Sequence, residues 1–307
     1  MYDITIAAIL TIITAATPLL YAAIGEMIVE KSGVLNLGVE GMILLGAVCG
    51  FATVHFTDSA TLGILMGMIA GMALSSIFAL LTLGLKASQV ASGLSLTIFG
   101  IGLSALLGQS LVGVAYDGLP KLSIPLLSDI PVIGILLFNH DILVYGSFAV
   151  TALAVWFLNS TRAGLILRAV GDSHDAAHAI GYPVLKIRFL AVLFGGAMAG
   201  LAGAYLSLSY SPLWIENMSA GRGWIALALV VFATWRPLRV FVGAYLFGGI
   251  TILQLHAQAL GVGVPSQIMS MLPYLATIIV LVLISRDQSK IKLNAPACIG
   301  KPFHPTS

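Results

Sequence analysis

Charged side chains are scarce in this sequence. Only 8% of its 307 residues are Asp, Glu, Lys or Arg, whereas 59% are hydrophobic and the mean hydropathy is +1.05. A soluble domain carries about 25% charged residues, because its surface must face water. A chain of this length with so few charges cannot cover a water-exposed surface. The composition therefore excludes a soluble fold and predicts a single membrane domain over residues 1–307.

Cysteine and the motifs of catalysis are equally sparse. Cys49 and Cys298 are the only cysteines, which is too few for a disulfide framework. The sequence has no His/Cys/Asp/Glu group with zinc or iron spacing, and no GxxxxGK[ST] phosphate loop. We therefore expect no enzyme activity, no metal and no cofactor on this chain. A net charge of +2, with no basic cluster interleaved with aromatic residues, argues against nucleic acid as a partner.

Long runs without charge are abundant, by contrast. A helix needs about 20 apolar residues to cross the ~30 Å hydrocarbon core of a membrane. The candidate runs are residues 4–25, 41–57, 59–85, 87–116, 142–161, 189–215, 223–235 and 240–285. A turn signal at residues 261–266 splits the last run into two spans. The run 223–235 is short, so it either extends backward past Arg222 or forms a half-helix beside a cavity. These runs predict an all-α, polytopic transmembrane helix bundle of about nine membrane segments, including a broken or re-entrant one.

The distribution of Lys and Arg predicts the orientation. Nine segments place the two termini on opposite sides of the membrane. If the C-terminus is cytoplasmic, only Lys121 and Arg222 lie outside, and the positive-inside rule is satisfied. The residues then inside are Lys31, Lys86, Arg162, Arg168, Lys186, Arg188, Arg236, Arg239, Arg286, Lys290, Lys292 and Lys301. We expect a multi-pass protein of the cytoplasmic membrane with an external N-terminus and a cytoplasmic tail at residues 286–307.

Small residues recur every fourth position on two of the predicted helices. Gly63, Gly67 and Gly71 form one stripe, and Gly196, Gly200 and Ala204 form another. Such stripes let helix backbones approach closely. They favour tight packing within the chain, with a seam against a second subunit as the alternative.

Polar residues and glycines interrupt the apolar pattern over residues 25–41. The glycines permit an unwound or re-entrant backbone there. Asn36 and Glu40 are four apart, hence on one face if the segment is helical. An ionisable group at membrane depth is costly unless it meets water, a partner or a substrate. Two interpretations stay open: Asn36, Gly38, Glu40 and Gly41 line a substrate path, or Glu40 stabilises a helix N-terminus.

The longest cytoplasmic connection in this topology covers residues 161–188. Asp172 or Ser173 can cap the N-terminus of a short alanine-rich helix, which Gly181 and Pro183 then terminate. The pattern predicts an amphipathic helix at the membrane surface. A surface helix implies no partner by itself, but it could serve as a docking surface through which a soluble partner transmits motion.

Three stretches resemble the importer permeases for branched-chain amino acids, sugars and nucleosides. They are GEMIVEKSGVLNLGVEGMILLG at residues 25–46, TRAGLILRAVGDSHDAAHAIG at 161–181 and AMAGLAGA at 197–204. The likeness covers nearly the whole chain in the expected order. The version NLGVEGM at residues 36–42 is most similar to the nucleoside and simple-sugar branch of the family.

The resemblance implies a permease subunit of an ATP-binding cassette (ABC) importer for a small polar solute. The implied partners are an ATPase with two nucleotide sites, which would bind ATP and Mg²⁺, a second identical or homologous permease, and an external binding protein or lipoprotein. The resemblance also implies that Gly171, Asp175, Ala176, Ala177 and Gly181 belong to a loop that couples to the ATPase. The loop departs from the family's usual Gly-Glu-Asn-Pro start, since it reads Gly-Asp-Ser-His.

Other transport classes fit some of the same features. An ion-coupled secondary transporter also uses broken helices and an intramembrane carboxylate. A permease for branched-chain amino acids lies within the same resemblance, and a channel is a further alternative. Dependence of uptake on ATP and a partner ATPase would separate the importer from the ion-coupled and channel classes.

Overall fold

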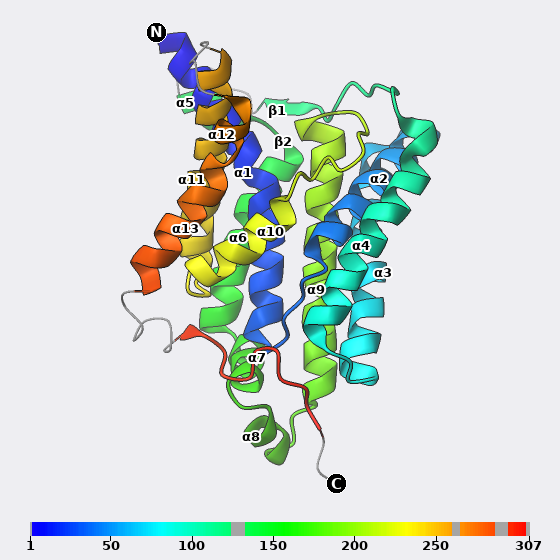
Figure 1. The fold of residues 1–307 in the computed structure, drawn as a ribbon, viewed down its shortest axis with the longest axis vertical. Coiled ribbons are helices and arrows are strands. Elements are labelled where there is room, and N and C mark those ends of the chain that lie inside the picture. Colours follow the sequence, from blue (N-terminus) through cyan, green and yellow to red (C-terminus); the bar gives the residue numbers. More distant parts are fainter. Residues whose placement is uncertain (1, 124–132, 260–264, 286–293, 305–307) are drawn as a thin grey trace.

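A computed structural model describes residues 2–123, 133–259, 265–285 and 294–304, which form an elongated bundle of helices (Figure 1). This confirms the predicted all-α class. The helices are α1 (Tyr2–Lys31), α2 (Val39–Thr57), α3 (Ala60–Ala79), α4 (Gln89–Gly108), α5 (Ile133–Phe138), α6 (Ile142–Ser160), α7 (Arg162–Asp172), α8 (His174–Ala179), α9 (Val184–Tyr205), α10 (Arg222–Phe232), α11 (Pro237–Ala259), α12 (Ser266–Ser270) and α13 (Leu272–Ser285). Wider helical turns, η1 (Leu80–Gly84) and η3 (Leu206–Tyr210), extend α3 and α9, and η2 (Gln109–Leu111) follows α4. Strand β1 (Lys121–Ser123) pairs antiparallel with β2 (Asn139–Asp141).

Seven helices among the described residues are long and apolar enough to cross a membrane. Their spans are Ile6–Lys31, Val39–Thr57, Ala60–Gly84, Gln89–Leu111, Ile142–Ser160, Val184–Tyr210 and Pro237–Ala259. The predicted nine segments are somewhat more than these seven, and the shorter helices α10, of 11 residues, and α13, of 14 residues, make the two numbers compatible. Helix α10 begins at Arg222 and does not extend backward, so the half-helix interpretation describes it. Most of the predicted turn at 261–266, and residues 286–293 and 305–307 of the predicted tail, lie outside the described residues.

The two ends of the chain lie at opposite ends of the bundle (Figure 1). Helices α7 and α8 lie at the same end as the C-terminal segment. This arrangement is compatible with termini on opposite sides of a membrane, and the identity of the cytoplasmic side stays a prediction.

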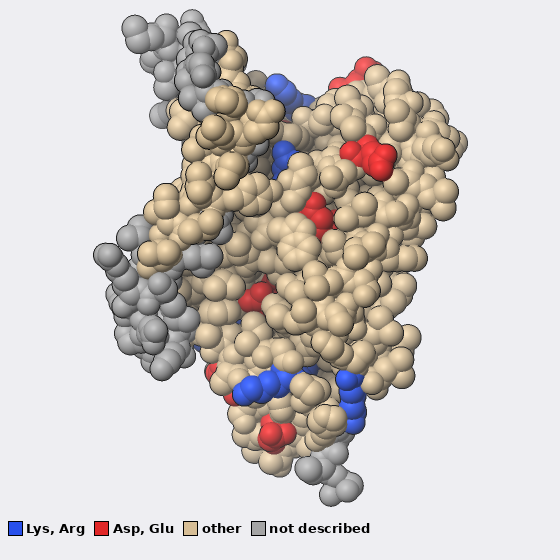
Figure 2. Space-filling model, viewed as in Figure 1, with Lys and Arg blue, Asp and Glu red and all other residues tan. Residues whose placement is uncertain are grey.

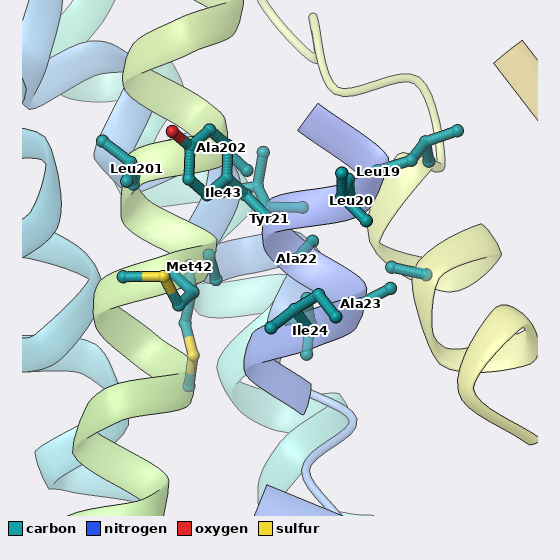
Figure 3. Packing of buried hydrophobic residues seen from close by; sticks show 14 of the residues in the cluster. Leu19, Leu20, Tyr21, Ala22, Ala23, Ile24, Met42, Ile43, Leu201 and Ala202 are labelled. Atoms are coloured by element: carbon teal, nitrogen blue, oxygen red, sulfur yellow. The ribbon is translucent and has the colours of Figure 1, made fainter. Parts of the chain in front are cut away.

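Helix α1 differs from its prediction. It continues without a break to Lys31, so the predicted unwinding over residues 25–41 is confined to residues 32–38. Gly25 serves close packing rather than an unwound backbone, since a Cβ there would lie 2.6 Å from the Cβ of Met198 on α9. Helix α1 packs mainly against α9 and α11, and its residues 19–24 are buried in the core of the bundle (Figure 3).

The two stripes of small residues face each other within the chain. A Cβ on Gly71 of α3 would lie 2.1 Å from the carbonyl oxygen of Gly196 on α9, and one on Gly67 would lie 2.7 Å from the Cβ of Ala204. Backbones this close leave no space for a larger side chain. The prediction of tight packing within the chain is therefore confirmed.

Candidate functional site

Residues 32–38 form an irregular segment that returns from the end of α1 into the bundle (Figure 1). Irregular backbone at membrane depth requires protein partners for its polar groups, because lipid supplies none. Here α1, α4 and the segment itself supply them. Leu35 N–H donates to Gln89 Oε1 (2.8 Å), Asn36 N–H to Glu26 Oε1 (3.1 Å), Thr97 Oγ1 to the Leu37 carbonyl (2.8 Å) and Gly38 N–H to Asn36 Oδ1 (2.9 Å).

Asn36 lies in this segment and not on a helix. Its Oδ1 accepts from the N–H two residues on, which is the local bond that makes Asn favour turns over helices. Helix α2 begins only at Val39, so the expectation that Asn36 and Glu40 share a helical face is wrong. Both side chains are nevertheless buried in the bundle, Asn36 completely.

Glu40 joins the start of α2 to the start of α10. Its Oε1 accepts from Ser219 Oγ (2.5 Å) and Gly221 N–H (2.8 Å), and its Oε2 accepts from Gly223 N–H (2.6 Å). The carboxylate therefore satisfies free N–H groups at the N-terminus of α10, where the helix dipole also favours negative charge. The helix-stabilising interpretation describes this geometry, except that the stabilised helix is distant in sequence. A role for Glu40 in a substrate path stays a prediction.

The donors that hold Glu40 are all neutral. Arg222 turns its guanidinium away, since its Nη1 donates to the Met218 carbonyl (3.1 Å) and its Cζ lies 5.1 Å from the ring centre of Tyr210. Hydrogen bonds to a charged acceptor are shorter and stronger than neutral ones. Three of them make Glu40 a firm link between two helices that both begin inside the bundle.

Glycine lets these elements meet. A Cβ on Gly223 would lie 2.5 Å from Glu40 Oε2, and a Cβ on Gly41 would lie 2.7 Å from the Leu96 carbonyl of α4. A Cβ on Gly38 would lie 3.0 Å from Asn36 Oδ1, a contact that is tight but less severe. Gly38 and Gly41 are thus placed to bring α2 against α4 beside the predicted path.

Two further carboxylates, which the sequence did not predict as site residues, are buried on α1. Glu26 and Glu30 are each 1% exposed and lie one turn apart on α1. Glu26 holds the irregular segment through Asn36 N–H, and Glu30 Oε2 accepts from Trp235 Nε1 (2.5 Å) in the turn after α10. The second oxygen of each carboxyl finds no partner among the described residues. Acidic side chains are visible at isolated points in the otherwise uncharged middle of the molecule (Figure 2).

Helix α10 is consequently held at both ends by glutamates of the α1–α2 unit. Glu40 binds its N-terminus, and Glu30 binds Trp235, which has a left-handed backbone (φ 52°) in the turn to α11. The spacing of Glu26 and Glu30 by four residues, in direct continuation of the first apolar run, is the signal that could have indicated a shared buried face.

The predicted coupling loop forms two helices, α7 and α8. Ser173 caps α8, because its Oγ accepts from Ala176 N–H (3.3 Å). Asp172, the alternative cap, is the last residue of α7. Gly181 has φ +92°, a left-handed conformation suited to glycine, just beyond the end of α8.

The five coupling candidates divide by exposure. Asp175, Ala176 and Gly181 are exposed at the end of the molecule, whereas Gly171 and Ala177 are buried. A Cβ on Gly171 would lie 2.1 Å from the Lys31 carbonyl, so Gly171 sets the contact of α7 with the end of α1. Ala177 belongs to a small apolar cluster with Val170, Val184 and Phe303.

The described part of the C-terminal tail packs against this loop, at the level of α7 (Figure 1). Cys298 N–H donates to the Gly171 carbonyl (2.9 Å) and Gly300 N–H to the Gly33 carbonyl (3.1 Å). Arg188, fully buried, joins three segments by bonds to the Ser32 carbonyl (3.0 Å), the Lys301 carbonyl (3.2 Å) and His174 Nδ1 (3.0 Å). Burial, and next the positive charge of Arg188, lower the pKa of His174.

Comparison with known proteins gives a consistent picture. Residues 8–282 match the family described as the permease component of the branched-chain amino acid transport system. The chain is 41% identical to TsgC13 of Haloferax volcanii, named for glucose ABC transport, over 95% of both chains. It is 34% identical to the nucleoside ABC transporter permease protein NupC of Lactococcus lactis over 87% of this chain and 89% of that one. It is also 32% identical to the guanosine ABC transporter permease protein NupQ of Bacillus subtilis over 96% and 97%. No solved structure matches the chain.

Proposed function

This chain belongs to the family of permease components of branched-chain amino acid transport systems, and we propose on that premise that it is the membrane-spanning subunit of an ABC importer for a nucleoside or a simple sugar. Relatives named for glucose, nucleoside and guanosine transport support this substrate class over branched-chain amino acids. The relatives are transport components rather than enzymes. An ion-coupled carrier or a channel is disfavoured by the same family membership.

The observation that carries the proposal is the meeting of α2 and α10 inside the bundle at Glu40. Helices that begin at membrane depth are typical of solute sites in transporters, because their ends expose polar backbone groups. Asn36 and Glu40, with Gly38 and Gly41 beside them, would line or shape the path for a polar solute. Binding there must stay weak, since an external binding protein captures the solute and the permease must release it.

The proposed partners would supply ATP hydrolysis and capture of the solute. A separate ATPase with two nucleotide sites would bind ATP and Mg²⁺, and a second permease would complete the path. The exposed Asp175, Ala176 and Gly181 around α8 would dock on that ATPase, while Gly171 and Ala177 hold the loop in shape. An external binding protein or lipoprotein would meet the opposite face, with the N-terminus outside and the C-terminus in the cytoplasm.

Reconstitution tests this function. The chain is assembled in proteoliposomes with a partner ATPase, a second permease and an external binding protein from the same organism. We expect uptake of radiolabelled guanosine or glucose with ATP, and none with a non-hydrolysable ATP analogue. Uptake driven by an ion gradient in liposomes that contain the chain alone would contradict the importer assignment, and uptake restricted to leucine would contradict the substrate class.

A further inference from the structure

A groove of about 650 Å³ opens on the outside of the bundle between α6, α7 and α9. Its wall is almost entirely apolar, and no acidic residue lines it. Ile28 of α1 lies at its floor, while Leu153, Trp156 and Leu190 line it with 58%, 59% and 56% of their surface exposed. The groove therefore reaches from the surface that would face lipid to α1.

The groove has the length of one membrane leaflet. It follows α9 from Pro183 to Phe194, which is about 16 Å at the rise of an α-helix. Half of the ~30 Å hydrocarbon core of a bilayer is about the same length. An apolar groove of this length suits an acyl chain.

Along the groove, apolar residues are followed by amphipathic rings and then by basic residues, which matches the order of acyl chain, interface and headgroup in a phospholipid. The far end is aliphatic and aromatic, as at Val150 and Phe194. Tyr182 and Trp156 supply amphipathic rings nearer the end of the molecule that carries α7 and α8, where such rings suit the membrane interface. Arg162 and Lys186 are exposed at that same end, and each lies four residues before a lining residue, Ile166 and Leu190, hence close to the helix face that lines the groove. Basic residues beside an apolar groove complement an anionic headgroup.

We propose that this groove is a binding site for one anionic phospholipid of the leaflet next to α7 and α8. Its acyl chain would lie between α6 and α9, and its phosphate would contact Arg162 and Lys186. The lipid would contact the membrane-spanning helices α6 and α9, and also α7 and Tyr182, which lie on either side of α8 in the sequence. If the proposed function holds, bound lipid would therefore support the transmission of motion from the ATPase.

Native mass spectrometry of the purified full chain tests the site without any ATPase, so its outcome is independent of the proposed function. The chain is titrated with phosphatidylglycerol or phosphatidylcholine of identical acyl chains. We expect tighter binding of phosphatidylglycerol, and a loss of about 30-fold in its affinity in the double variant Arg162→Gln, Lys186→Gln, since each basic residue near anionic lipid strengthens binding about fivefold. Lys121→Gln, exposed at the opposite end, should leave the affinity unchanged.

Filling the groove provides a second arm. Ala163→Trp and Leu190→Trp should each lower the affinity for both lipids, whereas Ile98→Trp, at a residue of α4 that is 72% exposed, should not. Equal effects of all three substitutions, or equal binding of the two lipids, would mean unspecific surface lipid and overturn the proposal. A disulfide between two copies that carry Leu153→Cys in a background without Cys49 and Cys298, together with absence of bound lipid, would overturn it in favour of a subunit interface.

Discussion

The bond between Glu40 and α10 gives the sharpest structural prediction. Glu40→Ala removes three acceptor contacts and leaves the Gly221 and Gly223 N–H groups and the Ser219 hydroxyl without a partner in the bundle. Each buried donor left unpaired costs about 1–3 kcal/mol, so we expect the start of α10 to lose about 4 kcal/mol of local stability. Glu40→Gln keeps one acceptor oxygen but turns an NH₂ group toward a donor, and we expect a loss of about 2 kcal/mol.

Hydrogen exchange followed by mass spectrometry measures this local loss directly. Peptides that cover residues 219–225 should exchange about 30-fold faster in Glu40→Gln, and faster still in Glu40→Ala, because 1.4 kcal/mol corresponds to a factor of ten. Glu216→Gln is the matched control, since Glu216 is an exposed carboxylate in the same connection. Exchange at 219–225 that is unchanged in Glu40→Ala would refute the capping role.

Further predictions concern the other contacts of the site and the coupling loop. Trp235→Phe removes the donor to Glu30 and should cost about 1–3 kcal/mol at the turn after α10, detected by faster exchange of the 233–240 peptide. Gly71→Ala should lower thermal stability by about 1–3 kcal/mol through overpacking against α9, measured by thermal unfolding in detergent against Gly102→Ala, where a Cβ meets open space. Ala176→Trp should abolish ATPase binding in a pull-down without changing stability, whereas Ala177→Trp should disrupt the fold of the loop because Ala177 is buried. The pKa of His174 is lowered, so packing of the tail should be fully stable above the ordinary histidine pKa of about 6.5 and should weaken as pH falls below it. Hydrogen exchange of the tail peptide measures this. The same pH dependence of exchange in the parental chain and in His174→Gln would contradict the role of His174.

The sequence was informative where local pattern determines structure. Apolar runs located the spans, and the short run after Arg222 indicated the half-helix that became α10. The spacing of Gly67 and Gly71 predicted a close helix contact, although it could not name α9 as the partner. Asp172 and Ser173 both have a side chain that can cap a helix, so the sequence could not decide that Ser173 is the cap.

Contacts between segments that are distant in sequence could not be predicted from local pattern. Nothing near Glu40 in sequence indicates that its carboxylate binds α10, since Ser219 and Gly223 become its neighbours only when the bundle forms. The glycines of residues 25–41 suggested a longer break, but α1 stays helical up to Lys31, and the carboxylate of Glu26 on α1 accepts from the N–H of Asn36 in the irregular segment. The buried bonds of Arg188 to the tail likewise depend on tertiary structure, because a basic residue beside a predicted span fits a surface position equally well.

Substrate selectivity of the assembled importer tests the central claim most directly. Initial rates of ATP-driven uptake of guanosine, glucose and leucine are compared for the parental chain, Asn36→Ala and Glu40→Gln, at equal amounts of assembled complex. We expect uptake of a nucleoside or a simple sugar by the parental complex, and an altered rate or altered preference among these solutes in both variants. Uptake of leucine alone, or parental rates and selectivity in both variants, would contradict it.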